Sequence, residues 1–277
     1  QGGLGNGDFG LIFGNPGGGK SWSLVALGAH AVKLGYNVLH YTLELGEQYV
    51  GRRYDAYFSK IGVDKIQKHK DKIESIMEDL KGNLIIKEFP TGKATMSTIE
   101  SHIQKVKDTG IEPDLIIIDY VDLLSSKRKT VDRKGEIDDI YTSTKGLARE
   151  LDIPVWSVSQ VNRAGAKDNI VEGDKAAGSY DKIMITDVCI SLSRQRKDKV
   201  EGTGRFHIMK NRYGMDGLTF GVKADTSTGH FEVSNDLYHE GENDNDDVTQ
   251  TPQNNSFSGI DKFDRGELKK KFFEINK

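Results

Sequence analysis

The sequence predicts an α/β fold: a mostly parallel, twisted sheet with helices on both faces and antiparallel strands at its C-terminal edge. From residue 9 to residue 160, apolar segments of strand length alternate with segments of helical periodicity, which is typical of a parallel sheet. After residue 187, strand-like segments follow one another directly and are separated by glycine-containing turns. Such spacing favours antiparallel neighbours at one edge.

Composition sets the limits of what the chain can be. With 277 residues, 36% of them hydrophobic, the chain can bury the core of one α/β domain with appendages. A single cysteine, Cys189, excludes an intramolecular disulfide and is typical of a reducing, cytoplasmic compartment. No apolar run reaches 18 residues, so we expect no membrane partner. Because the chain begins at Gln1, about ten residues before the first strand, we expect a fragment that lacks an N-terminal portion.

Residues 14–21 fit the phosphate-loop pattern of glycine, four variable residues and Gly-Lys-Ser. Glycines allow consecutive backbone N–H groups to converge on an anion, and the following helix adds partial positive charge. Lys20 can then reach the outer phosphates, and the Ser21 hydroxyl can bind Mg²⁺. The alternative is a glycine-rich turn with a solvated lysine. The strand-like run at residues 9–13 and the helix-like segment at 22–33 favour the phosphate site.

The next elements follow from apolar spacing. Strands are expected at residues 38–43, 84–86 and 115–118. The first of these ends in Glu44, and the third, the most hydrophobic, ends in Asp119. Helices are expected at residues 47–60, 64–80 and 97–107, where apolar side chains recur every three or four positions.

Two polar loops mark the second half of the predicted domain, at residues 125–135 and 162–179. Between them, a helix with an apolar stripe ends near Leu151, and a strand at residues 155–159 ends in Gln160. Further strands are expected at residues 188–192, 206–209 and 218–222, with a weaker one at 231–233.

The character of the chain changes near its C-terminal end. We expect a domain over residues 1–238 and an acidic, polar linker over residues 239–256, which has almost nothing to bury. Residues 257–277 regain apolar side chains, and Asp264 and Glu267 have the spacing of a capping box. This last segment is predicted to be an amphipathic docking helix; packing on its own domain, or disorder, is the alternative.

Three polar residues stand at the ends of predicted strands, where parallel strands meet at one edge. Asp119 is positioned to hold Mg²⁺. Glu44 could polarise an attacking water as general base, and Gln160 could contact the terminal phosphate. For Glu44 and Gln160, an ordinary surface residue at a strand end explains the pattern equally well.

These segments together resemble the motor domain of DnaB-type replicative helicases, which has a RecA-like P-loop ATPase core. The resemblance covers about residues 1–233 and is carried by the phosphate loop and four further segments. A Ser-Gln-x-Asn-Arg run after a strand is unusual outside this family. The four segments are Thr42-Leu43-Glu44, residues 115–120, residues 154–163 and Lys210-Asn211-Arg212-Tyr213-Gly214.

The resemblance implies an ATP-dependent hydrolase with ATP and Mg²⁺ as its cofactors. Glu44 would be the catalytic base, Gln160 the sensor of the terminal phosphate, and Ser21 and Asp119 the metal residues. Lys210 and Arg212 would reach into a neighbouring subunit's ATP, where an arginine can stabilise the transition state roughly a thousandfold. Nucleotide contacts are expected from Gly14, Asn15, Pro16, Gly17, Gly18, Gly19, Lys20, Ser21 and Trp22.

The family also places single-stranded DNA in the channel of a homo-hexamer. The predicted DNA contacts lie in the two polar loops. Five cations within residues 125–135 suit contacts to the phosphate backbone, although a basic surface loop that binds nothing has the same pattern. Further partners implied are a primase, a helicase loader or another replisome protein, in a bacterial or phage-infected cell. The predicted DNA-binding residues are Lys127, Arg128, Lys129, Arg163, Lys167 and Lys175.

The sequence departs from the family pattern at three places. Trp22 stands where the family usually has a small residue, and Asp122 where it commonly has an amide. Residues 178–182 match the family's fourth motif only in part. Two other functions share the core features: a strand-exchange recombinase that forms filaments on single-stranded DNA, and an assembly protein that uses ATP as a switch without unwinding.

Overall fold

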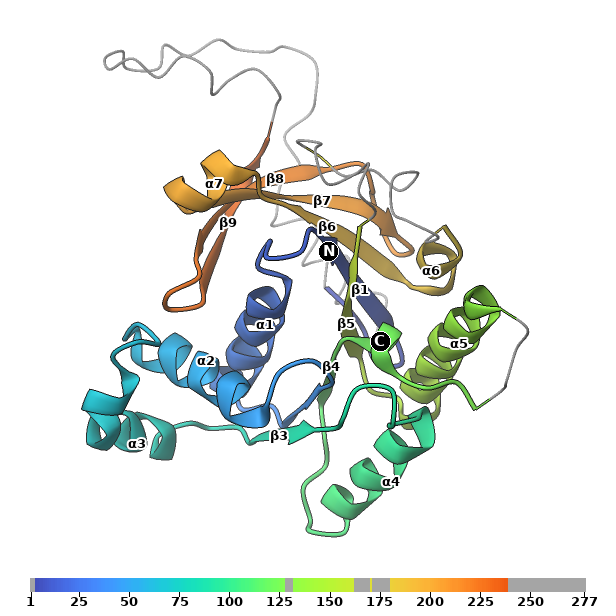
Figure 1. Cartoon of the computed structure of the whole chain (residues 1–277), viewed down its shortest axis with the longest axis horizontal. Helices are drawn as coiled ribbons and strands as arrows, with labels where there is room; N and C mark the ends of the chain where they lie inside the picture. The colour runs from blue at the N-terminus through green and yellow to red at the C-terminus, as the bar shows by residue number, and fades with distance from the viewer. Residues whose placement is uncertain (1–2, 128–131, 162–169, 171–179, 239–277) are drawn as a thin grey trace, which may run out of the picture. The chain divides into compact units, whose positions relative to one another are not determined.

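A nine-stranded sheet forms the centre of the computed structural model, which describes residues 3–127, 132–161, 170 and 180–238. The strand order is β3-β2-β4-β5-β1-β6-β7-β8-β9 (Figure 1). The strands are β1 (Phe9–Gly14), β2 (Val38–Thr42), β3 (Leu84–Glu88), β4 (Leu115–Asp119), β5 (Val155–Gln160), β6 (Val188–Ser193), β7 (Thr203–Asn211), β8 (Thr219–Asp225) and β9 (His230–Leu237).

The first six strands in this order run parallel, and β7, β8 and β9 extend the sheet with antiparallel pairings. One expectation is corrected here. The segment 188–192, grouped with the antiparallel strands, pairs in parallel with β1 and is antiparallel only to β7. The chain returns from β5 through a connection that includes helix α6 (Tyr180–Ile185), and a crossover of this length suits a parallel neighbour.

Helices cover the two faces of the parallel strands. Ile116 and Ile118 of β4 belong to the core beneath α4 (Met96–Lys107) and α5 (Arg133–Leu151). Ile117, between them, faces the opposite core, beneath α1 (Lys20–Leu34) and α2 (Glu47–Ser59). Figure 1 shows these two pairs of helices on opposite sides of the sheet. All three isoleucines are fully buried, as expected for a strand covered on both faces.

Some element boundaries differ from the sequence expectations. The helix expected over residues 64–80 is divided into a 3₁₀ turn, η1 (Ile66–His69), and α3 (Lys70–Glu78). The short elements η2 (Val121–Leu123), α6 and α7 (Arg196–Glu201) were not predicted, because six residues or fewer show too little periodicity. Strand β9 is longer than the segment predicted at 231–233.

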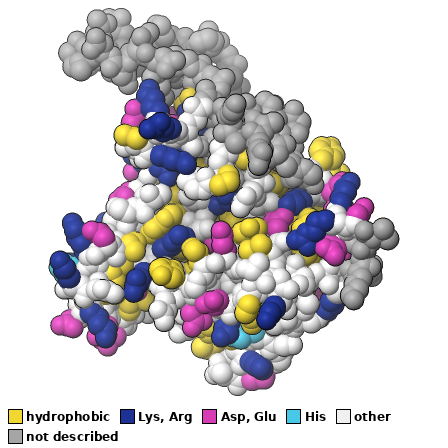
Figure 2. Space-filling view, in the orientation of Figure 1, with side chains coloured by type: hydrophobic (Ala, Val, Ile, Leu, Met, Phe, Trp, Pro, Cys, Tyr) yellow, Lys and Arg dark blue, Asp and Glu magenta, His cyan; other side chains and the backbone are white. Residues whose placement is uncertain are grey.

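The surface carries both signs of charge. In the face shown in Figure 2, acidic and basic side chains are interspersed, in line with a net charge of −3 for the whole chain. Among the described residues, no helix has the length and apolar character needed to cross a membrane.

Candidate nucleotide-binding and catalytic site

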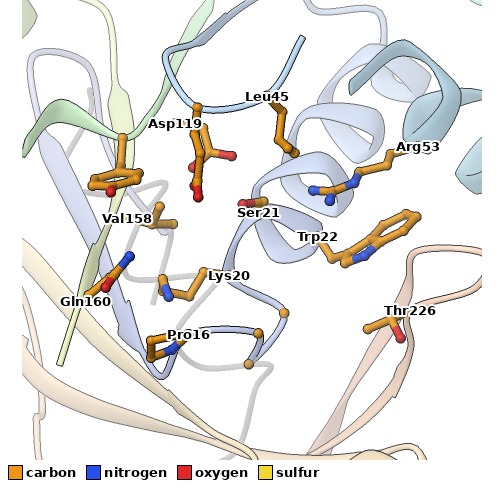
Figure 3. Close-up of a pocket in the computed structure, with 15 residues that line it drawn as sticks. Pro16, Lys20, Ser21, Trp22, Leu45, Arg53, Asp119, Val158, Gln160 and Thr226 are labelled. Carbon is orange, nitrogen blue, oxygen red and sulfur yellow. The ribbon is translucent and has the colours of Figure 1, made fainter. Parts of the chain in front are cut away.

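A pocket of about 330 Å³ opens at the carboxyl edge of the parallel strands (Figure 3). Strands β4, β5 and β1 are neighbours in the sheet, so the segments that follow them converge there, as is usual for ligand sites in α/β folds. The pocket brings together most of the residues predicted for this site: Pro16, Gly17, Gly18, Gly19, Lys20, Ser21, Trp22, Glu44, Asp119 and Gln160.

The phosphate loop has a backbone that requires glycine at two positions. Gly17 and Gly19 adopt φ values of 65° and 99°, in the left-handed region that residues with a side chain rarely occupy. Gly19 directly precedes α1, whose first residue is Lys20. The N–H groups of the loop and of the first helical turn therefore face the pocket, which suits an anion.

Lys20 is buried within this loop. Its ammonium donates hydrogen bonds to the carbonyl oxygens of Gly14 and Asn15, each at 3.0 Å. Burial lowers its pKa, while the nearby carboxylates of Asp119 and Glu44 act in the opposite direction. The charge is thus only partly compensated, and a phosphate group beside it would stabilise it further.

Asp119 and Ser21 lie together at the other side of the pocket. The Asp119 side chain is 2% exposed and accepts a hydrogen bond from the Ser21 hydroxyl. Its Oδ1 has no hydrogen-bond partner among the described residues. Burial raises the pKa of this carboxyl, and Glu44 contributes in the same direction.

The pair Asp119 and Ser21 fits a hydrated Mg²⁺. No group of three or more His, Cys, Asp or Glu side chains in the described part of the chain could hold a metal ion. One carboxylate and one hydroxyl, completed by water and phosphate oxygens, is the arrangement that Mg²⁺ commonly adopts at nucleotide sites. The unpartnered Oδ1 supplies a negative oxygen for such a shell.

Glu44 and Gln160 enter the pocket from two other strand ends. Glu44 lies two residues beyond the end of β2, and Gln160 is the last residue of β5. Both side chains are exposed, so water reaches them. In Figure 3, the Gln160 amide and the Lys20 ammonium lie on either side of the space above Pro16.

Arg53 is a pocket residue that the site prediction missed. It extends from α2 toward Ser21 (Figure 3), and its guanidinium lies over the Trp22 ring at 4.9 Å. The carboxylates of Asp119 and Glu44 both act on its pKa. The sequence contains a signal for it, since Arg53 stands between Val50 and Tyr57 on the otherwise apolar stripe of this helix.

Two further cations approach the phosphate loop from the segment after β6. The Arg194 Nη1 lies 3.4 Å from the position that a side-chain carbon on Gly19 would occupy, and the Lys199 Nζ lies 3.7 Å from that position on Gly17. Arg194 is held by the carbonyl oxygens of Thr203 and Ala224. These cations are more than 170 residues from the loop in sequence, so only the fold reveals them.

Lys210 and Arg212 lie at the opposite end of the sheet from the chain's own phosphate loop. Asn211 pairs with Val188, which pairs with Gly10, whereas Gly14 is four residues further along β1. At about 3.3 Å per residue, these rows are roughly 13 Å apart. The Lys210 ammonium donates to the carbonyls of Ile183, Met184 and Thr186.

Of the predicted DNA-binding residues, only Lys127 is described. Its side chain is 55% exposed, and its ammonium lies 3.9 Å from a carboxylate oxygen of Glu100 on α4. The others lie outside the described residues: Arg128, Lys129, Arg163, Lys167 and Lys175.

Comparison with known proteins identifies the family of this site. Residues 1–231 match the family model for the DnaB-like helicase C-terminal domain. A DnaB-like replicative helicase of Enterobacteria phage T4 is 27% identical over 212 residues, which are 71% of this chain and 44% of that protein. A probable plasmid replicative DNA helicase of Chlamydia psittaci is 26% identical over 251 residues, 85% of this chain and 53% of that protein. The chain thus spans about half the length of these relatives.

Two solved structures share the fold. One is a separate ATPase domain, and the other is a DnaB-like replicative helicase described with its interactions with primase. Each superposes with a TM-score of 0.71 at 21% identity. Each comparison covers 82% of this chain, with 85% of the first structure and 57% of the second. The expected RecA-like core with a mostly parallel sheet is therefore confirmed.

Proposed function

We propose that this chain, which belongs to the DnaB-like helicase C-terminal domain family, is the ATP-hydrolysing motor of a replicative DNA helicase. The observation that carries the proposal is the convergence of Lys20, Ser21, Glu44, Asp119 and Gln160 on one pocket. The motor would work as a ring of six identical subunits that moves along single-stranded DNA and separates duplex ahead of it.

In this proposal, the phosphate loop binds the triphosphate through its N–H groups and Lys20. Ser21 and Asp119 hold Mg²⁺, which neutralises charge that develops on the phosphate oxygens when it is bound. Glu44 orients the attacking water and accepts its proton, and Gln160 contacts the terminal phosphate. The exposure of both side chains to the pocket supports these two roles.

Arg212 is proposed to act in a neighbouring subunit's site. Support comes from its distance from the chain's own phosphate loop, since it lies beyond the row of Asn211 at the far end of the sheet. Its side chain is 43% exposed and thus accessible to a partner. The role of Lys210 in a neighbour's site stays a prediction, because its ammonium already has three carbonyl partners within the chain.

The DNA is proposed to contact the two polar loops through Lys127, Arg128, Lys129, Arg163, Lys167 and Lys175. A primase or another replisome protein is the further partner we propose, because one solved relative is described with its interactions with primase. The family membership favours this function over that of a filament-forming recombinase.

Mixed subunits test the shared site directly. Arg212→Ala and Lys20→Ala proteins should each be inactive, with the arginine loss costing about 10³-fold or more. Mixed in equal amounts, about a quarter of the interfaces pair an intact loop with an intact arginine, so up to about a quarter of the wild-type ATPase rate should return. No return of activity in rings shown to contain both proteins would contradict the shared site.

A further inference from the structure

The turn that carries Arg212 is tied to the sheet by two buried carboxylates that the mechanism above does not use. Asp187, directly before β6, is fully buried, and its Oδ1 lies 2.9 Å from Arg212 Nη1. Asp8, directly before β1, accepts a hydrogen bond from the Tyr213 hydroxyl at 2.5 Å.

Asp187 is itself fixed to the strand that leads into the phosphate loop. The Phe9 N–H donates to Asp187 Oδ2 at 2.8 Å, and the Asp187 N–H donates to the Phe9 carbonyl at 2.9 Å. The Arg212 N–H donates to the Asp187 carbonyl, also at 2.9 Å. Arg212 is therefore anchored by both its backbone and its side chain to one residue.

The charges of this cluster balance internally. The Lys145 ammonium contacts Asp187 Oδ2 and lies 3.8 Å from Asp8 Oδ1. Lys145 thus occupies one oxygen of Asp187, and the other oxygen faces Arg212. No hydrogen bond of suitable geometry reaches Oδ1 from the described residues, so this oxygen stabilises the guanidinium by charge and leaves its N–H groups for a ligand.

We propose that Asp187 and Tyr213 are positioning residues that hold Arg212 at the height and orientation needed to meet the phosphates of the adjacent subunit. The proposal rests on the shared site proposed above. A guanidinium on a flexible side chain loses much of its effect if its position varies, because a 1 Å displacement of a catalytic group can cost about 10²-fold in rate. Two anchors on consecutive residues restrict that variation.

Tyr213→Phe is the main test, since the change removes one oxygen from a ring that is 60% exposed and leaves its packing intact. We expect a roughly 5- to 10-fold lower kcat for DNA-stimulated ATP hydrolysis with an unchanged KM, because Arg212 acts on the transition state. Affinity for ADP with aluminium fluoride, a mimic of that state, should fall by a similar factor. Affinity for a non-hydrolysable ATP analogue should not change.

Asp187→Asn should show the same pattern with a larger loss. Tyr36→Phe is the matched control: Tyr36 is also exposed, and its hydroxyl makes no hydrogen bond among the described residues. If Asp187→Asn does not fold, because Lys145 loses its partner, Tyr213→Phe decides alone.

The outcomes separate the two proposals. If Arg212→Ala has wild-type activity, the shared site is wrong and the positioning role falls with it. If Arg212→Ala is inactive but Tyr213→Phe keeps wild-type kcat and aluminium fluoride affinity, the shared site stands and the positioning role is overturned. An equal loss of ATP-analogue and aluminium fluoride affinity would also overturn it, because that loss indicates a general structural defect.

Discussion

Asp119 carries a charge that the fold alone compensates poorly. Burial raises its pKa above the ordinary value of 3.8. For an acid with a raised folded-state pKa, the ionised form is the costly one, so its contribution to stability falls as the pH rises above 3.8. At neutral pH, the protein without Mg²⁺ therefore retains a destabilising charge in the pocket, which a bound cation would relieve.

Asp119→Asn should stabilise the metal-free protein and inactivate it. We expect an unfolding temperature about 2–4 °C higher in EDTA, corresponding to about 1 kcal/mol, and a loss of Mg²⁺-dependent ATPase of roughly 100-fold. Thermal unfolding with and without Mg²⁺ and ATP analogue, together with rate measurements, tests both. Asp79→Asn, at an exposed position after α3, is the control. A variant that unfolds at a lower temperature than wild type in EDTA would contradict this account.

Residues of the site were predictable where a local pattern fixes them. The phosphate loop is a contiguous motif, and Asp119 and Gln160 end apolar runs that could only be buried strands. Arg53, Arg194 and Lys199 lack such a frame. Whether a cation on a helix or after a strand turns toward the pocket depends on tertiary packing, which spacing alone does not fix.

At the scale of elements, a buried ion pair joins the segments that follow β4 and β5. The Lys182 ammonium, on α6, contacts the Asp122 carboxylate of η2 and donates to the Ser159 hydroxyl at 2.9 Å. The Tyr141 hydroxyl, on α5, donates to the other Asp122 oxygen at 3.0 Å. Four elements therefore meet at Asp122, beside the strand ends that carry Asp119 and Gln160.

Breaking this pair from one side should destabilise the protein. Lys182→Met leaves the Asp122 carboxylate buried without its cation, and we expect a loss of about 3 kcal/mol in the free energy of unfolding. Asp122→Asn combined with Lys182→Met should recover most of that loss, because no buried charge remains. Denaturant unfolding measures both. Lys134→Met breaks the exposed pair with Asp181 and should cost less than about 1 kcal/mol; an equal cost at both positions would contradict the difference.

Elements were predictable in proportion to their length and periodicity. The long helices α4 and α5 were expected within a few residues of their observed bounds, since each carries an apolar stripe. The direction of β6 was wrong because glycine-containing turns occur only after it, between β7, β8 and β9, whereas a crossover precedes it. Strand β9 lies at the sheet edge with mostly exposed side chains, so its sequence shows little alternation beyond residue 233.

At the scale of the whole molecule, the sheet connects two functional ends. Strand β1 begins beside Asp187 and ends at the phosphate loop, so the anchor of Arg212 and the nucleotide site of one chain lie on the same central strand. A strand paired on both sides is among the most rigid parts of a fold. In a ring, this arrangement would link the position of the arginine offered to one neighbour to the phosphate loop that faces the other.

The predicted docking segment lies outside the described residues, so its role is a prediction for experiment. By internal contacts, the chain separates after His239 into two units, and all described residues belong to the first. Since the core clusters contain only residues of that first unit, residues 1–239 should fold without the remainder. We expect a protein truncated after His239 to unfold within about 2 °C of the full chain, a difference below about 1 kcal/mol.

The same truncation should retain DNA-stimulated ATPase activity and lose binding to one replication protein. A primase or a helicase loader added to the full chain and to the truncated chain, with affinity measured by calorimetry, distinguishes the two effects. Loss of basal ATPase activity in the truncated protein would instead mean that residues 240–277 pack on the motor and complete it. A Leu268→Asp change within the full chain provides the matched test, because it disrupts the predicted apolar face while leaving the acidic linker and the chain length unchanged.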